Sequence, residues 1–171
     1  MWHILRRVAR VGLVPTEPVS EPAAAAAARG DLDAELLRLL GRALAVRLVD
    51  AGSCNGCEFE LNALGNAHYN LEGRGVHFVA SPRHADMLLV TGPVSRHMEA
   101  ALRRTCDATP EPRLVIAVGE CGANGGEFGA SYASCGAVAE VIRVDAVIRG
   151  CPPTPLALMR GILEAIGKRA G

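Results

Sequence analysis

Five short apolar segments alternate with helical patterns along most of this chain, and this alternation constrains its fold more than any other feature. The segments are near-continuous apolar runs, such as DMLLVTG and RLVIAVGE. Strands of this type are buried on both faces, and the helices between them supply the crossovers that parallel strands need. The sequence therefore predicts an α/β fold with a parallel sheet covered by helices on both faces. The expected strands are 43–52, 76–80, 86–92, 113–120 and 144–150, and the expected helices between and after them are 58–66, 96–108 and 156–168.

The composition fits one folded domain with a tail. The chain has 171 residues, of which 50% are hydrophobic and only 4% aromatic, so its core must be built from Ala, Val, Leu and Ile. Lys plus Arg equals Asp plus Glu at 18 each, and this neutral balance gives no electrostatic case for binding nucleic acid. We expect no signal peptide and no membrane span, since no run approaches the roughly 20 apolar residues that a span needs.

The first 42 residues have a different character from the rest. Residues 1–14 alternate apolar and basic side chains, a Pro- and Ala-rich stretch follows, and residues 31–42 show a helical pattern. We therefore expect an N-terminal extension with a short helix at 1–42, followed by an α/β domain at 43–171. Two interpretations of residues 1–14 stay open: a frayed terminus, or an arm that lies on a partner subunit or a membrane surface.

Four of the six cysteines come shortly after predicted strands. Because the carboxyl ends of parallel strands meet at one rim of a sheet, we expect these four thiols to lie close together. The first two belong to the turn DAGSCNGCE, where Gly56 is expected to supply the backbone freedom that the turn needs. Glycine also stands shortly before each of the other two, which lets the backbone approach a bulky cofactor. The four cysteines are Cys54, Cys57, Cys121 and Cys151.

Four thiolates suit either tetrahedral zinc or a [4Fe–4S] cluster. Zinc ribbons usually have two Cys-x-x-Cys knuckles, whereas this chain combines one such knuckle with two single cysteines at strand ends. This arrangement modestly favours the cluster over zinc. Inert buried thiols and a thioredoxin-type dithiol also stay open, although a pure dithiol leaves Cys121 and Cys151 unexplained. Cys106 lies in a helical pattern and is expected to pack in the core. Cys135 is a rival fourth ligand, ranked below Cys151 because no strand end precedes it.

Several motifs, in the same order, resemble the small iron–sulfur subunit family shared by respiratory complex I and membrane-bound [NiFe] hydrogenases. They are SPR-x-AD, PEPR-x-V, G-x-C-x-x-x-GG and GCPP, and the resemblance spans roughly residues 45–167. It implies a flavodoxin-like, doubly wound parallel sheet that binds one [4Fe–4S] cluster. It gives no ligand role to the two other cysteines. The ligands implied by the resemblance are Cys54, Cys57, Cys121 and Cys151.

The resemblance also implies a function within a larger complex. The Cys-Asn-Gly-Cys motif is similar to the energy-converting hydrogenase and formate hydrogenlyase branch, whereas the complex I branch generally has adjacent cysteines. We therefore expect an electron-transfer subunit of such an oxidoreductase complex. Its cluster would relay electrons to an active site at the interface with a large catalytic subunit, and this chain alone would hold no complete active site. A ferredoxin-like iron–sulfur subunit and membrane subunits are further expected partners, with a peripheral position on the cytoplasmic side of the membrane.

Alternative functions stay open at this point. One is the equivalent subunit of an NADH-quinone oxidoreductase or of a related complex without nickel, and another is a zinc-stabilised structural subunit. Two side chains are candidates for tuning the cluster. Glu60 either takes up a proton as the cluster is reduced or simply lies at a helix N-terminus. Arg83 either raises the cluster potential or forms an ion pair with Asp86 in a turn.

Overall fold

The computed structural model of the protein describes residues 2, 6 and 43–170, and the expected extension at 1–42 otherwise lies outside the described residues. Its main sheet has five parallel strands in the order β2-β1-β3-β5-β7. Numbered along the chain, these strands have the flavodoxin-like order 2-1-3-4-5, which confirms the predicted fold class. The strands are β1 (Leu44–Asp50), β2 (Val76–Phe78), β3 (Met87–Thr91), β5 (Leu114–Val118) and β7 (Ala146–Ile148).

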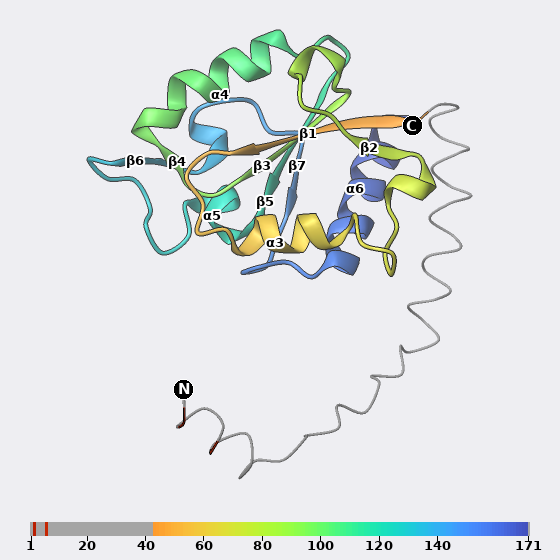
Figure 1. Cartoon of the computed structure of the whole chain (residues 1–171). Helices are drawn as coiled ribbons and strands as arrows, with labels where there is room; N and C mark the ends of the chain where they lie inside the picture. Colours follow the sequence, from red (N-terminus) through yellow and green to blue (C-terminus); the bar gives the residue numbers. More distant parts are fainter. Residues whose placement is uncertain (1, 3–5, 7–42, 171) are drawn as a thin grey trace.

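Helices cover both faces of this sheet (Figure 1). Helices α3 (Gly56–Ala63) and α6 (Pro155–Ala170) pack on one face, and α4 (Arg96–Ala108) covers the other. Side chains alternate along each strand, so Val46 of β1 joins the core under α3 and α6 while Val49 joins the core under α4. Burying one such large apolar side chain contributes about 1.5–3 kcal/mol, which explains why nearly every strand position is apolar.

The amino ends of neighbouring strands are locked together by two aspartates. Asp86 accepts a hydrogen bond from the N–H of Ala45 (3.1 Å) through its carboxylate, and its own N–H donates to the carbonyl of Ala45 (2.8 Å). Asp145 forms the same pair of bonds with Val115, at 2.9 and 2.8 Å. These bonds fix the register at one end of the sheet. The opposite end, where the strands terminate, carries the cysteines.

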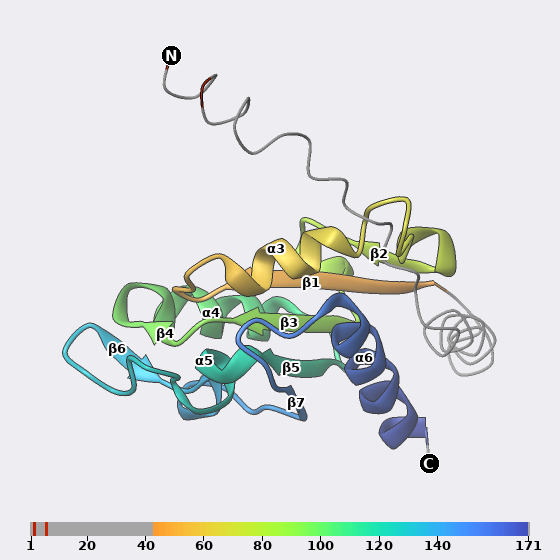
Figure 2. The same cartoon turned by 90° about the horizontal axis from the view of Figure 1, so that it is seen from below.

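Several short elements were not predicted. Strands β4 (Val94–Ser95) and β6 (Ser134–Gly136) form a small antiparallel sheet, and α5 (Gly119–Asn124) begins directly after β5. Three 3₁₀ helices complete the described chain: η1 (Glu72–Arg74), η2 (Pro82–His84) and η3 (Val138–Glu140). Seen from the second direction, β4, β6 and α5 lie at the same end of the molecule (Figure 2). Within the described residues, the helices are too short or too polar for any of them to cross a bilayer.

Candidate metal centre

The four predicted cysteines lie at the carboxyl rim of the sheet. Cys54 lies between β1 and α3, and Cys57 is in the first turn of α3. Cys121 lies within α5, immediately after β5, and Cys151 follows β7. Cys54 and Cys151 are exposed, whereas Cys57 and Cys121 are half-buried. Three strand ends thus present four thiols to one edge of the molecule.

Main-chain contacts hold the segments that carry these cysteines against one another. The N–H of Glu120 donates to the carbonyl of Gly150 (3.0 Å), which joins the start of α5 to the end of β7. The Glu120 carboxylate also pairs with Arg149 at 3.0 Å. A Cβ atom placed on Gly56 would lie 3.5 Å from the Sγ of Cys54 and 3.8 Å from the Cβ of Pro152. The knuckle therefore sits beside the residue that follows Cys151.

Two glycines bring the backbone unusually close to the sulfur atoms. Gly119 has a φ of +80°, and a Cβ there would lie 2.6 Å from the Sγ of Cys57. Gly126 has a φ of +56°, and its Cβ would lie 2.6 Å from the Sγ of Cys121. Both positions need the conformation and the space that only glycine provides. The backbone thus forms a cradle around the thiols, as expected where a chain approaches a bulky group.

The thiols also influence one another electrostatically. Burial raises the pKa of Cys57 to about 12, and the charges of Glu58 and of the other three cysteines add to this effect. Burial likewise raises the pKa of Cys121, followed by the charges of Cys151 and Cys54. Several thiolates at this rim therefore need a compensating positive charge. A bound metal supplies that charge and displaces the thiol protons.

The donor set fits a soft metal centre. Among the described residues, no group of three or more His, Cys, Asp or Glu side chains is arranged to hold a single metal ion. In a [4Fe–4S] cluster each cysteine binds a different iron, so the four thiolates are spread around the cluster. Four thiols at one rim, two of them directly against glycine backbone, match that arrangement in chemistry. The cysteines that would hold the cluster are Cys54, Cys57, Cys121 and Cys151.

Asp50 shapes the turn that leads into Cys54. Its Oδ1 atom accepts hydrogen bonds from the N–H groups of Gly52 and Ser53, both at 2.8 Å. Burial tends to raise the pKa of Asp50, but the hydrogen bonds from Ser53 and Gly52 outweigh it, and the pKa lies below its ordinary value. Asp50 was not among the site residues predicted from the sequence. An Asp two residues before a Gly is the available signal, because Asp commonly caps its own turn in this way.

The expectation that Gly56 supplies the freedom of the knuckle was wrong. Gly56 is the first residue of α3, and the left-handed conformation falls on Asn55, with a φ of 68°. Asn tolerates this conformation better than other non-glycine residues because its short polar side chain bonds locally. The N–H of Asn55 also donates to the Ser53 hydroxyl at 3.1 Å.

The predicted tuning residues lie in different places. Glu60 is half-buried in α3, three residues after Cys57. Arg83 is exposed in η2 just before β3, so the length of that strand separates it from the cysteine rim. Both tuning roles stay predictions. Glu58 was not among the predicted tuning residues, yet it is only 7% exposed beside Cys57, and its carboxylate oxygens have no hydrogen-bond partner in the described structure. No sequence signal distinguishes it, since an acidic residue in the first turn of a helix is ordinarily solvated.

The two other cysteines do not join the rim group. Cys106 is buried in the core between α4 and the sheet, as expected for a packing residue. Cys135 lies in β6, where its Sγ donates to a carboxylate oxygen of Glu99 at 3.3 Å. Burial first, and then this carboxylate, raise the pKa of Cys135.

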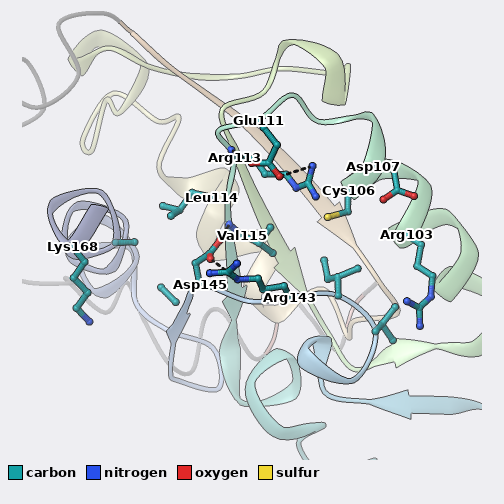
Figure 3. Close-up of a pocket in the computed structure, with 14 residues that line it drawn as sticks. Arg103, Cys106, Asp107, Glu111, Arg113, Leu114, Val115, Arg143, Asp145 and Lys168 are labelled. Carbon is teal, nitrogen blue, oxygen red and sulfur yellow. Dashed lines mark hydrogen bonds and ion pairs between the residues drawn. The ribbon is translucent and has the colours of Figure 1, made fainter. Parts of the chain in front are cut away.

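A cavity of about 650 Å³ lies away from the four rim cysteines, at the amino ends of β5 and β7. Figure 3 shows that charged side chains line it and pair with one another. Arg113 contacts Glu111 at 3.1 Å, and Arg143 contacts Asp145 at 3.5 Å. Its place at the opposite end of the sheet separates this cavity from the candidate metal centre.

Comparison with known proteins identifies a family whose members are similar in sequence to this chain. A family model described as "NADH ubiquinone oxidoreductase, 20 Kd subunit" matches residues 54–165, a range that includes all four rim cysteines. Formate hydrogenlyase subunit 7 of Escherichia coli is 41% identical over 136 residues, which cover 80% of this chain and 53% of that protein. The chain therefore spans about half the length of that relative.

Two further similarities cover most of both chains. The probable membrane-bound hydrogenase subunit mbhJ of Pyrococcus furiosus is 41% identical over 137 residues, which cover 80% of this chain and 82% of that protein. A chain in the structure of the membrane-bound sulfane sulfur reductase, an archaeal respiratory membrane complex, superposes with a TM-score of 0.61. It is 29% identical, and the match covers 82% of this chain and 74% of that chain.

Proposed function

Because the chain belongs to the family of the NADH ubiquinone oxidoreductase 20 kDa subunit, we propose that it is the electron-transfer subunit of a larger oxidoreductase complex. One [4Fe–4S] cluster is held by Cys54, Cys57, Cys121 and Cys151 within an α/β domain at 43–171. The observation that carries the proposal is the cradle at the rim. Four thiols from three strand ends meet there, and Gly119 and Gly126 leave no room for a Cβ beside two of the sulfurs.

The cluster, when bound, supplies one-electron transfer. The residues of this chain hold it and set its surroundings. The four cysteines are the ligands, and Asp50 and Asn55 shape the knuckle that presents the first two of them. Burial and nearby charges, including the buried Glu58 carboxylate, contribute to the reduction potential. Substrate bonds are made and broken at an active site completed by a large catalytic subunit that covers the rim.

The hydrogenase or formate hydrogenlyase branch is the favoured setting. The Cys-Asn-Gly-Cys spacing supports it, as do the matches to formate hydrogenlyase subunit 7 and to mbhJ, each of which covers 80% of this chain. The proposed partners are the large catalytic subunit, a ferredoxin-like iron–sulfur subunit and membrane subunits, with this chain peripheral on the cytoplasmic side. The likeness to a chain of the sulfane sulfur reductase supports a second candidate, a related respiratory membrane complex other than a hydrogenase.

Metal analysis of the natively purified complex tests this proposal. We expect iron, and about four iron atoms assigned to this chain. Zinc bound to this chain without iron would instead identify a zinc-stabilised structural subunit. The sequence of the large subunit separates the two complexes. Two Cys-x-x-Cys motifs there indicate nickel and a hydrogenase, and their absence indicates another electron acceptor.

A further inference from the structure

One edge of the main sheet is incomplete next to the cysteine rim. Strand β2 pairs with β1 only as far as the partners Val46 and Phe78. The last hydrogen bond on this side runs from the N–H of Val79 to the carbonyl of Val46 (2.8 Å). Strand β1 continues to Asp50, and β3 pairs with it along this whole stretch. Figure 2 shows β1 extending past β2 toward the start of α3. Within the described chain, the carboxyl half of β1 thus has a strand on one side only.

The main-chain groups of alternate residues in this half strand point toward the open side. The N–H of Leu44 donates to the carbonyl of Gly75 on the β2 side, whereas the N–H of Ala51 donates to Thr91 on the β3 side. Successive residues of a strand direct their N–H and C=O groups to opposite sides, so Leu48 and Asp50 share the direction of Leu44. Beyond Val79, no described residue bonds to their main-chain groups on that side. Such an edge is a template for another strand.

A cavity of about 400 Å³ lies beside this edge. Both Arg47 and Leu48 line it, although neighbouring residues of a strand face opposite sides of the sheet. A space that contacts both must lie at the edge of the sheet, in the position where a further strand would run. Its remaining walls come mainly from α3 and from the segment that follows β2. Among these wall residues are Leu61, Asn62, Phe78, Val79 and Ala80.

The lining of this cavity indicates what the missing strand must offer. Leu61 and Phe78 make one wall of the cavity apolar. The occupant that satisfies these groups is an extended peptide. Its main chain would pair with Leu48 and Asp50, and an apolar side chain would face Leu61 and Phe78.

We propose that an extended segment of a partner subunit completes this edge by adding a strand beside β1. The inference rests on the proposed function, because it places the chain inside a complex. The open edge leads through Asp50 directly into the turn that carries Cys54. A subunit that covers the cysteine rim is therefore continuous with the edge, and a strand from it would anchor that subunit by main-chain hydrogen bonds.

Hydrogen exchange measured residue by residue tests the proposal directly. The isolated, cluster-loaded chain and the native complex are compared. The amides of Leu48 and Asp50 should exchange at least about tenfold more slowly in the complex. The amides of Arg47 and Val49 face β3 and serve as an internal control, protected in both samples. Equal exchange of the Leu48 and Asp50 amides in both samples would overturn the proposal.

Residues 1–42 of the same chain are the rival occupant. If the Leu48 amide is already protected in the isolated full-length chain and loses that protection when residues 1–42 are deleted, the edge belongs to the chain's own N-terminal segment. That result would also overturn the proposal.

A cavity-filling variant gives a second test. Ala80 is exposed and lines the cavity, so Ala80→Trp fills the strand position without disturbing the core. Ala101 is equally exposed but lies on α4, and Ala101→Trp is the matched control. We expect Ala80→Trp to weaken assembly with the other subunits about tenfold, equivalent to ~1.4 kcal/mol, and Ala101→Trp to leave it unchanged. Unweakened assembly of Ala80→Trp contradicts the proposal.

Both variants should bind iron and show the same reduced-cluster spectrum as the wild-type chain. If the wild-type chain itself bound no iron, that result would count against the proposed function. If Ala80→Trp had normal iron content and assembled normally with the other subunits, that result would count against the strand addition but not against the proposed function.

Discussion

A Cβ atom added to Gly119 would lie 2.6 Å from the Sγ of Cys57, closer than real Cβ contacts come. Gly119 is the first residue of α5, and Cys57 belongs to α3. The backbone that follows β5 therefore passes directly beside a thiol that follows β1. This contact brings the ends of β1 and β5 together at the cysteines. A single methyl group added at Gly119 would therefore displace the Cys57 sulfur.

We expect Gly119→Ala to disrupt the metal centre. The substitution forces a Cβ onto the Cys57 sulfur and places a side chain at a φ of +80°. The backbone strain alone costs about 1–3 kcal/mol, so both the iron content and the melting temperature should fall. Gly167→Ala is the control, because a Cβ there meets nothing within 4 Å on α6. The control should keep its iron and gain up to about 1 kcal/mol of stability, since Ala favours a helix over Gly. Full iron content in Gly119→Ala would show that the contact is not needed.

The turn before Cys54 should depend on the Asp50 carboxylate. Asp50→Ala removes the acceptor of two main-chain hydrogen bonds, and we expect it to lower the free energy of unfolding by about 1 kcal/mol. The pKa of Asp50 is lowered in the folded chain, so its contribution is present above the ordinary value of 3.8 and is lost as the pH falls through the lowered value. Urea unfolding of the metal-free chain measures this. The difference between wild type and Asp50→Ala should be largest near neutral pH and shrink in acid. A difference that does not depend on pH would contradict the role of the charge.

Cys57 should make the metal-free chain sensitive to alkali. Its pKa rises from 9.0 to about 12 on folding, mainly through burial. The unfolded chain therefore gives up the Cys57 proton first, and the stability contributed by the protonated thiol is lost as the pH rises between those two values. The free energy of unfolding should fall less steeply over this range in Cys57→Ser than in the wild type. Identical pH profiles for the two proteins would show that the thiol is not perturbed.

The sequence was sufficient to predict the sheet and the meeting of the cysteines. Runs such as DMLLVTG have no polar face and are short, which is typical of strands buried on both sides, and the structure places Met87–Thr91 accordingly. Parallel strands bring their carboxyl ends to one rim, which is why the sequence alone allows Cys121 and Cys151 to be grouped with Cys54 and Cys57. Helix α4 was predicted at its observed limits, 96–108, because its apolar residues fall on one face.

Other features depend on tertiary contacts that carry no local pattern. Strand β4 has only two residues and β6 only three, too few for any periodicity to mark them. The choice between Asn55 and Gly56 for the left-handed residue is set by where α3 begins. The burial of Glu58 results from packing at the rim rather than from its neighbours in the chain. The open edge of β1 follows from the early end of β2 at Phe78, which the apolar run VHFVA does not reveal.

Serine substitutions should separate the ligands from the other cysteines. Cys54→Ser, Cys57→Ser, Cys121→Ser and Cys151→Ser should each abolish or convert the cluster. Cys106→Ser and Cys135→Ser should retain its absorption spectrum, because Cys106 packs under α4 and Cys135 contacts Glu99 instead. Loss of the spectrum in Cys135→Ser with retention in Cys151→Ser would reassign the fourth ligand.

The most direct test of the central claim is electron paramagnetic resonance of the anaerobically reconstituted and reduced chain, with its metal content measured on the same sample. The account predicts about four iron atoms per chain and the signal of a reduced [4Fe–4S] cluster. Stoichiometric zinc, with no iron uptake and no signal, would contradict it.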